Sequence, residues 1–203
     1  MDLFLGYDPG GRDCHGVAAA EISRDGSFVK DPKTAIVRDA AEALEWLSQH
    51  GGATFLGIDT LLAWSRKGGR ACDDWLRQKY KGRGGPSVIA QNSLYSSMTL
   101  NGAMVAMEMK RRKPSLLLCE SHPKLQMSAD FLLIEVAKFH AALGTQNKND
   151  HSGDALVAAW CASRWHYRAW TVDLFKLPLS DNDLVFPAGE AVYPWPKSAL
   201  ARQ

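Results

Sequence analysis

The stretch Leu-Phe-Leu-Gly-Tyr-Asp at residues 3–8, followed by Pro-Gly-Gly at 9–11, decides the fold. A short apolar run that ends in a carboxylate and a turn signal predicts a buried strand that stops at the edge of a sheet. The pattern returns in Thr-Phe-Leu-Gly-Ile-Asp at 54–59. In both runs a glycine stands two residues before the aspartate, so the two positions share a strand face. If the two strands are parallel neighbours in register, Asp8 and Asp59 lie side by side.

The rest of the chain reads as strands that alternate with helices. Apolar runs, turn signals and helical periodicity predict strands at 3–8, 16–22, 34–37, 54–59 and 116–119, and helices at 39–50, 73–80, 94–112, 128–143 and 154–167. A hairpin followed by alternating elements indicates an α/β fold with a mixed sheet, parallel in its later part and covered by helices on both faces. The length of 203 residues predicts a single domain spanning 1–203. Ligands of such sheets bind outside the carboxyl ends of the parallel strands.

Two further acids are expected at this edge of the sheet. Glu120 closes the strand at 116–119, and Asp154 opens the helix at 154–167. A carboxylate buried at a strand end is costly unless a cation or a hydrogen-bond donor meets it, and neighbouring carboxylates raise one another's pKa. Because hard divalent cations prefer oxygen ligands, Asp8, Asp59, Glu120 and Asp154 together predict a Mg²⁺ or Mn²⁺ site. Taken singly, Asp8 also suits a turn and Asp154 a helix start.

Composition sets broad limits on the class of protein. The chain is 46% hydrophobic and 23% charged, which is usual for a globular protein, and no apolar run approaches the length of a membrane span. The start Met1-Asp2 lacks the basic and apolar regions of a secretory signal. The four cysteines lie far apart, which argues against a zinc knuckle or a disulfide scaffold. We therefore expect a cytoplasmic protein with reduced thiols and no membrane partner.

The basic residues are unevenly distributed, although the net charge of +2 is too small to indicate nucleic acid by itself. The segment 65–84 is rich in cations and follows directly from the strand that ends in Asp59. The cations expected to hold phosphates are Arg66, Lys67, Arg70 and Arg77. Alternatively, Arg70 and Arg77 form ordinary pairs with the acids of their own short helix. A second basic cluster at 110–113 is attributed to the favourable interaction of cations with a helix carboxyl end.

At these residues the chain resembles a known group, the DUF429 family of predicted nucleases with a ribonuclease H-like fold. The resemblance covers most of the chain and depends on the order and spacing of short motifs. These are GYDPGG at 6–11, GID at 57–59, RACDDWLR at 70–77, CESHP at 119–123 and DHSGDALVAAW at 150–160. The segment 189–194 is similar to the closing strand of the family.

The resemblance implies a ribonuclease H-like mixed five-stranded sheet of order 3-2-1-4-5, with carboxylates on the first and fourth strands and on the last long helix. Asp8 then falls on the first strand, Asp59 on the fourth and Glu120 on the fifth. Asp154 falls on the helix, with Asp150 one turn earlier as a further metal ligand. Two departures from the family pattern are the absence of a proline after Asp59 and the presence of Lys124 where an acid often follows His-Pro. Lys124 is therefore not expected to be a ligand.

These observations lead to an expected function in nucleic-acid hydrolysis. A phosphodiester hydrolase of this kind uses two Mg²⁺ or Mn²⁺ ions about 3.5–4 Å apart. Asp8 would bridge the ions, and Asp59, Glu120 and Asp154 would complete their shells. His15, His122 and His151 lie near the same edge as possible bases, although a structural role is more common for a histidine. The alternative is a non-catalytic ribonuclease H-like domain that binds a nucleotide, a nucleic acid or a partner protein.

Overall fold

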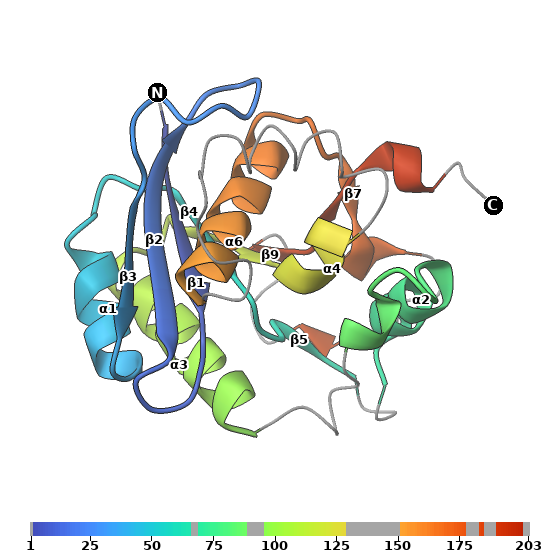
Figure 1. The fold of residues 1–203 in the computed structure, drawn as a ribbon, viewed down its shortest axis with the longest axis horizontal. Coiled ribbons are helices and arrows are strands. Elements are labelled where there is room, and N and C mark those ends of the chain that lie inside the picture. The colour runs from blue at the N-terminus through green and yellow to red at the C-terminus, as the bar shows by residue number, and fades with distance from the viewer. Residues whose placement is uncertain are drawn as a thin grey trace.

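The computed structural model describes residues 2–65, 69–88, 96–128, 151–177, 183–184 and 190–200. Its centre is a six-stranded sheet of order β3-β2-β1-β4-β6-β9 (Figure 1). The bounds of these strands are β1 Asp2–Asp8, β2 His15–Ile22, β3 Lys33–Val37, β4 Phe55–Ile58, β6 Leu117–Glu120 and β9 Ala191–Val192. The pairs β1–β2 and β2–β3 are antiparallel, whereas β1–β4, β4–β6 and β6–β9 are parallel. The expected α/β fold with a mixed sheet is confirmed.

Helices cover both faces of the sheet. Helix α6 (His151–His166) packs against β1, β2 and β4 on one face, where Phe4 and Phe55 join its alanines in the core. Helices α1 (Ala40–Ser48) and α3 (Ser96–Arg112) cover the other face, where they meet the alternate side chains of the same strands. Figure 1 shows α6 in front of the sheet and α1 and α3 behind it. The alternation of apolar side chains along β1 therefore fills two cores.

Glycines allow α6 to approach the sheet at backbone distance. A Cβ atom at Gly6 would lie 1.7 Å from the carbonyl oxygen of Ala155, and one at Gly57 would lie 2.0 Å from that of Ala158. A Cβ atom at Gly16 would similarly meet the carbonyl oxygen of His151 at 1.9 Å. These glycines sit on three adjacent strands, so any side chain there would push the helix away from the sheet.

Smaller elements complete the described structure. Figure 1 shows helices α2 (Ala71–Lys79) and α4 (Pro123–Ser128) to the right of α6. Two short antiparallel pairs join β5 (Ala63–Trp64) to β8 (Asp183–Leu184) and β7 (Val172–Asp173) to β10 (Pro194–Trp195). Single 3₁₀ turns occupy Gly85–Ser87, Leu174–Lys176 and Lys197–Ala199.

Several expected elements differ from those in the structure. The sheet has six strands where five are expected, because the short strand β9 pairs with β6. Helix α6 begins at His151, three residues before the expected start at Asp154. Asp39 caps α1 as expected, since its side chain accepts a hydrogen bond from the amide of Glu42 at 2.9 Å. The helix expected at 128–143 lies almost entirely outside the described residues. Among the helices that are described, none is long and apolar enough to cross a membrane.

Candidate metal centre at the carboxyl edge of the sheet

Asp8 and Asp59 lie next to each other at the ends of two parallel strands. In the β1–β4 pair, Gly6 stands opposite Gly57 and Tyr7 opposite Ile58. The amide of Asp59 donates a hydrogen bond to the carbonyl of Tyr7 at 3.0 Å, which continues this register one residue beyond the strand. The expected neighbourhood of the two Gly-x-Asp motifs is therefore confirmed.

Asp154 and His151 reach the same edge from the first turn of α6. Asp154 is 4% exposed and Asp8 is 2% exposed, so both carboxylates are buried. Nδ1 of His151 donates a hydrogen bond to Oδ2 of Asp8 at 2.6 Å, while the imidazole remains partly exposed. The close approach of α6 to the glycines of β1 and β4 brings Asp154 toward Asp8 and Asp59.

The pKa of Asp59 responds to both of its acidic neighbours. Asp59 has a pKa well above its ordinary value, first because of burial and then because of the negative charges of Asp8 and Asp154. Burial also raises the pKa of Asp8, although the hydrogen bond from His151 acts in the opposite direction. The same hydrogen bond raises the pKa of His151, which favours its protonated form. In their ionised forms these carboxylates repel one another, and a cation between them would remove that cost.

Glu120 points to the other face of the sheet from Asp59, which corrects the expectation that it is a fourth ligand, although its negative charge also raises the pKa of Asp59. In the β4–β6 pair, Glu120 stands opposite Ile58 and not opposite Asp59. The shift of one residue turns Glu120 to the face of the sheet that carries Leu118, whereas Asp59 shares the face of Gly57 and Cys119. A strand that ends in a carboxylate predicts the correct edge of the sheet, but the register decides the face.

Arg70 neutralises Glu120, so the expected phosphate contact of Arg70 is also corrected. The guanidinium group is fully buried and donates to Glu120 from Nη1 at 2.8 Å and to Asp73 from Nε at 2.7 Å. It also donates to the carbonyl of Ala63 at 3.3 Å, while the amide of Leu62 donates to Glu120 at 2.7 Å. A buried, fully engaged guanidinium cannot meet a phosphate at the surface.

The ligand atoms of Asp73, Glu120 and His122 lie within 4.8 Å of one another, the only such trio of acids, histidines or cysteines in the part of the chain that is described. Arg70 already supplies the positive charge between the two acids, so a metal ion has no electrostatic role there. The imidazole of His122 accompanies this group and stacks on Tyr193. By contrast, Asp8, Asp59 and Asp154 offer oxygen ligands of the kind that a hard divalent cation prefers, and the pKa values of Asp8 and Asp59 are raised. Their spacing exceeds that of the trio, so they surround more space than one tightly held ion fills.

The other expected phosphate-binding residues divide into two groups. Arg77 forms an ion pair with Asp74 three residues earlier and donates to the carbonyl of Val88 at 3.1 Å. This arrangement corresponds to the alternative structural role of Arg77. Arg66 and Lys67 lie outside the described residues, as does Asp150.

Lys124 acts electrostatically on the acidic cluster. The sequence pattern predicted only that Lys124 is not a metal ligand. The residue lies in the first turn of α4 and is exposed. Its positive charge lowers the pKa of Asp8, Asp59 and His151. His15 also faces this edge and shares a hydrogen bond of 2.8 Å with the hydroxyl of Tyr7. Burial lowers the pKa of His15, so its neutral form is favoured.

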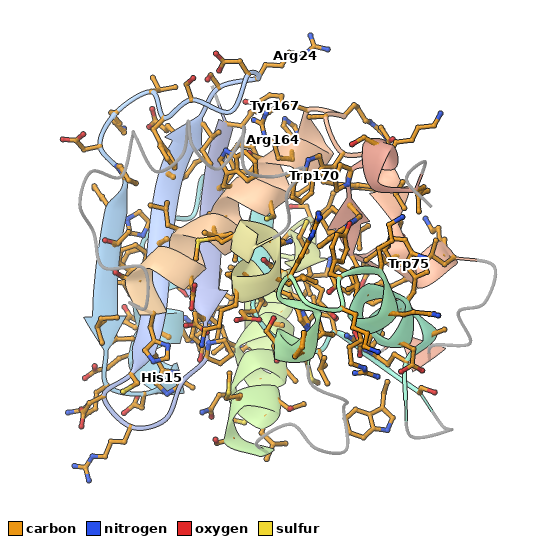
Figure 2. The ribbon with its side chains drawn as sticks, turned by 45° about the vertical axis from the view of Figure 1, so that its right-hand side comes forward. His15, Arg24, Trp75, Arg164, Tyr167 and Trp170 are labelled. Carbon is orange, nitrogen blue, oxygen red and sulfur yellow. The ribbon has the colours of Figure 1, made fainter. Side chains whose placement is uncertain are left out.

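A polar groove opens beside the cluster. It has a volume of about 430 Å³ and lies between the β1–β2 turn, the start of α1 and the first turns of α3. Figure 2 shows His15 at this edge of the sheet, at the opposite end from Arg24. The polar groups that line the groove come from Arg12, His15, Arg38, Asp39, Ser97 and Asn101.

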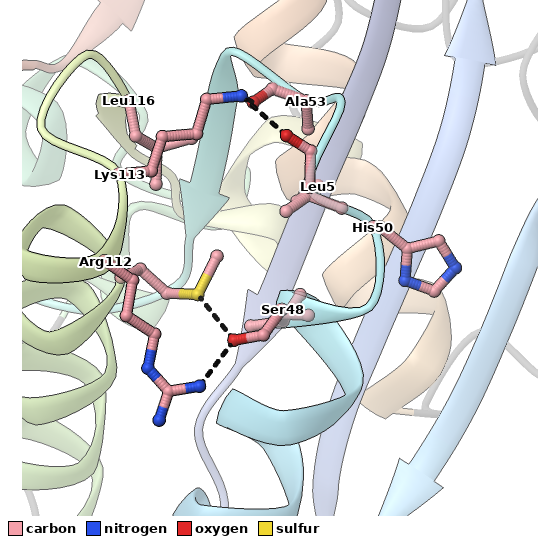
Figure 3. A pocket seen from close by; sticks show the side chains of 10 residues that line it. Leu5, Ser48, His50, Ala53, Arg112, Lys113 and Leu116 are labelled. Carbon is pink, nitrogen blue, oxygen red and sulfur yellow. Dashed lines mark hydrogen bonds between the residues drawn. The ribbon is translucent and has the colours of Figure 1, made fainter.

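A second cavity of about 490 Å³ lies at the opposite, amino-terminal edge of the parallel strands (Figure 3). There Lys113 donates to the carbonyls of Gly51 and Ala53, and Arg112 donates to the hydroxyl of Ser48 at 2.9 Å. The basic cluster at 110–113 thus ties the end of α3 to the end of α1 and the start of β4. These contacts agree with the structural role expected for cations at a helix end.

Comparisons with protein-family models, curated proteins and solved structures found no match to this chain.

Proposed function

We propose that the chain is a Mg²⁺- or Mn²⁺-dependent phosphodiester hydrolase that acts on nucleic acid and belongs to the DUF429 group of ribonuclease H-like nucleases. The spatial order β3-β2-β1-β4-β6, with carboxylates at the ends of β1 and β4, supports the ribonuclease H-like assignment. The short β9 beside β6 extends this arrangement without changing the position of the carboxylates.

The observation that carries the proposal is the gathering of Asp8, Asp59 and Asp154 at one edge of the sheet, where the negative charges of Asp8 and Asp154 raise the pKa of Asp59. These groups lie on two adjacent strands and on a helix that glycines hold against them. Each carboxylate would be more stable in water, yet the fold collects all three at one edge. Such an arrangement is expected where a divalent cation is part of the working protein.

Asp8, Asp59 and Asp154 are the residues proposed to hold the metal. A divalent cation bound there supplies a Lewis acid that activates water and stabilises negative charge on a phosphate. The hydrogen bond from Nδ1 of His151 fixes the orientation of the Asp8 carboxylate by engaging Oδ2. The partly exposed imidazole also holds a proton readily and can pass it to or from water near the site.

The proposed substrate is nucleic acid, and the groove beside the metal centre is the surface proposed to receive it. Arg12 lies in the turn between β1 and β2, and Arg38 lies between β3 and α1; both line this groove, and both side chains are more than half exposed. Their ion pairs with neighbouring acids are exposed and therefore weak, so a phosphate can compete for the guanidinium groups. Contacts of this kind hold a backbone without reading its bases.

Metal binding tests the proposal directly. Calorimetric titration with Mn²⁺ should show binding to the wild-type protein and its loss in Asp8→Asn and Asp59→Asn. The matched control is Asp74→Asn, which changes an exposed acid on α2 and should bind Mn²⁺ as the wild type does. Failure of the wild type to bind Mn²⁺ would refute the proposed metal centre.

Catalysis and binding can then be separated. With Mn²⁺, the wild type should cleave labelled single-stranded or duplex oligonucleotides, and Asp59→Asn should lose cleavage while keeping most of its affinity. Arg12→Ala should weaken binding and reduce its salt dependence by about one ion. If the protein binds oligonucleotides and Mn²⁺ but cleaves none of them, the non-catalytic ribonuclease H-like domain becomes the better description.

A further inference from the structure

Helix α3 turns a stripe of large apolar side chains outward. Leu100, Met104 and Met107 recur at helical spacing, so they lie along one side of the helix. That spacing usually marks the side that a helix buries. In the structure, however, these side chains are 61%, 62% and 56% exposed, and Val105 and Met109 make the core contacts of α3 instead. A continuous apolar stripe that faces water indicates a surface that another molecule covers.

Beside the stripe, the same face is hollowed between α1 and α3, the two helices behind the sheet in Figure 1. The groove has a volume of about 600 Å³. Its α1 wall is formed by Ala40, Ala41 and Leu44, whereas its α3 wall includes Met104 and Met107. The α1 side of this face therefore supplies room, and the α3 side supplies projecting side chains.

The two helices also differ in charge. Helix α1 contains Glu42 and Glu45 and neither lysine nor arginine. Glu45 is exposed and stands one turn after Ala41, so it lies on the outward side of the helix. The last turn of α3 contains three consecutive cations at 110–112, with a single acid, Glu108, just before them. The face is thus acidic along α1 and basic at the end of α3.

We propose that this face of α1 and α3 binds a second copy of the chain, in a symmetric dimer that places α3 of each copy on α1 of the other. In a twofold contact a patch meets its own copy, so its two halves must fit each other. The projecting Met104 and Met107 of one copy enter the groove beside the alanines of the other copy's α1, and Arg111 faces Glu45. Shape and charge therefore select the same pairing of helices.

The size of the face limits the strength of the dimer. Helix α3 has 17 residues and is about 25 Å long, and two helices side by side are about 20 Å wide. A contact of about 500 Å² in flat area on each copy is small for a specific interface, so we expect a reversible dimer with a micromolar dissociation constant. A second copy also suits the face better than an anionic membrane does, since the glutamates of α1 would repel such a surface.

The mass of the metal-free protein in solution tests the inference. In sedimentation velocity, the wild type should shift from the mass of one chain toward that of two between about 1 and 300 µM. Met104→Glu should keep the mass of one chain over this range, because a carboxylate within the contact would lose its water. The matched control is Val29→Glu, which changes an exposed valine outside α1 and α3 and should dimerise as the wild type does. Melting curves of both variants should agree with that of the wild type, since both positions are exposed.

An exchange of charge tests the pairing of the helices. Glu45→Lys makes α1 basic where it meets Arg111 of the other copy, and Arg111→Glu makes α3 acidic where it meets Glu45. Each variant alone should self-associate about tenfold more weakly than the wild type, because like charges then face each other at both contacts. An equimolar mixture of the two variants should recover the wild-type affinity, since every facing pair in the mixed dimer has opposite charge. The control Lys33→Glu makes the same kind of change on β3, and mixing it with Glu45→Lys should recover less.

The outcomes decide between occupants of the face. A wild type that remains a single chain at the highest concentration would overturn the inference, as would a dimer that persists in Met104→Glu. A mixture that fails to recover would overturn the pairing of α3 with α1 of the other copy. Flotation of the wild type with anionic lipid vesicles, lost in Met104→Glu, would assign the face to a membrane surface instead. None of these measurements uses the three aspartates, so the inference and the proposed function can fail separately.

Discussion

Two clusters of acids occupy the same edge of the sheet, and they differ in how their charge is compensated. Asp73 and Glu120 surround the guanidinium group of Arg70, which donates hydrogen bonds to both. In the second cluster, the negative charges of Asp8 and Asp154 instead raise the pKa of Asp59, and His151 donates a hydrogen bond to Asp8. The acids of the first cluster thus share a buried guanidinium group, whereas burial and neighbouring negative charge raise the pKa of Asp59 in the second. The comparison shows that burial of an acid at a strand end does not by itself indicate a metal site.

The largest expected effect is the loss of the internal cation of the first cluster. Arg70→Met leaves Asp73 and Glu120 buried without a partner, and should lower the free energy of unfolding by about 3–5 kcal/mol. Chemical denaturation followed by tryptophan fluorescence measures this change. Arg77→Met, on the same helix, removes a partly exposed pair and should cost less than about 1 kcal/mol. Equal losses in the two variants would contradict the contrast drawn between Arg70 and Arg77.

A second prediction concerns the helix that completes the other cluster. Gly57→Ala places a methyl group against the carbonyl of Ala158, which belongs to the helix backbone and cannot rotate away. We expect a loss of about 3 kcal/mol of stability, together with weaker Mn²⁺ binding, because α6 and Asp154 must move outward. Gly52→Ala is the matched control, since a Cβ atom there meets nothing within 4 Å. Normal Mn²⁺ affinity in Gly57→Ala would show that the site does not depend on the close approach of α6.

The smallest of these effects is a pH dependence that arises from the raised pKa of Asp59. Asp59 has a raised pKa in the folded protein, so the folded state holds this proton more tightly than the unfolded chain does. Its contribution to stability is therefore full below the ordinary pKa of 3.8 and is lost as the pH rises through the raised pKa. In EDTA, Asp59→Asn should become more stable than the wild type as the pH rises from about 4 toward neutrality.

Added Mg²⁺ or Mn²⁺ should reverse that difference, since the cation stabilises the wild type and not the variant. Melting temperatures measured across this pH range with and without the metal provide the test. A wild type that remains more stable than Asp59→Asn in EDTA at neutral pH would mean that Asp59 has a compensating partner.

The sequence predicted the parts of this site that depend on local pattern. The two Gly-x-Asp motifs share a spacing that predicts a common face, and the parallel pairing of β1 and β4 confirms it. Glu120 follows the same rule for strand ends, but the sequence contains no signal for the shift of one residue between β4 and β6. The burial of Arg70 could not be predicted from the sequence either. A cation next to two acids on a short helix usually forms an ion pair at the surface, and nothing in the sequence shows that Arg70 pairs with Glu120 on β6.

Strand β9, near the carboxyl terminus, could not be predicted from the sequence for a different reason. Strand β9 consists of Ala191 and Val192, which is too short a run to show alternation. Its place in the sheet depends on the exposed edge of β6, a tertiary feature that no local pattern records. His151, in contrast, is visible in the sequence as a possible base, and only its hydrogen bond to Asp8 gives it a definite role.

The glycine faces of β1, β2 and β4 also bear on how the protein is made. Asp8 and Asp59 are synthesised early, whereas Asp154 and the helix that rests on these glycines are synthesised much later. During translation one face of the sheet is present before α6 can cover it, so Asp8 and Asp59 are in place before Asp154 is synthesised. The group of three aspartates is therefore complete only once α6 has docked on the sheet.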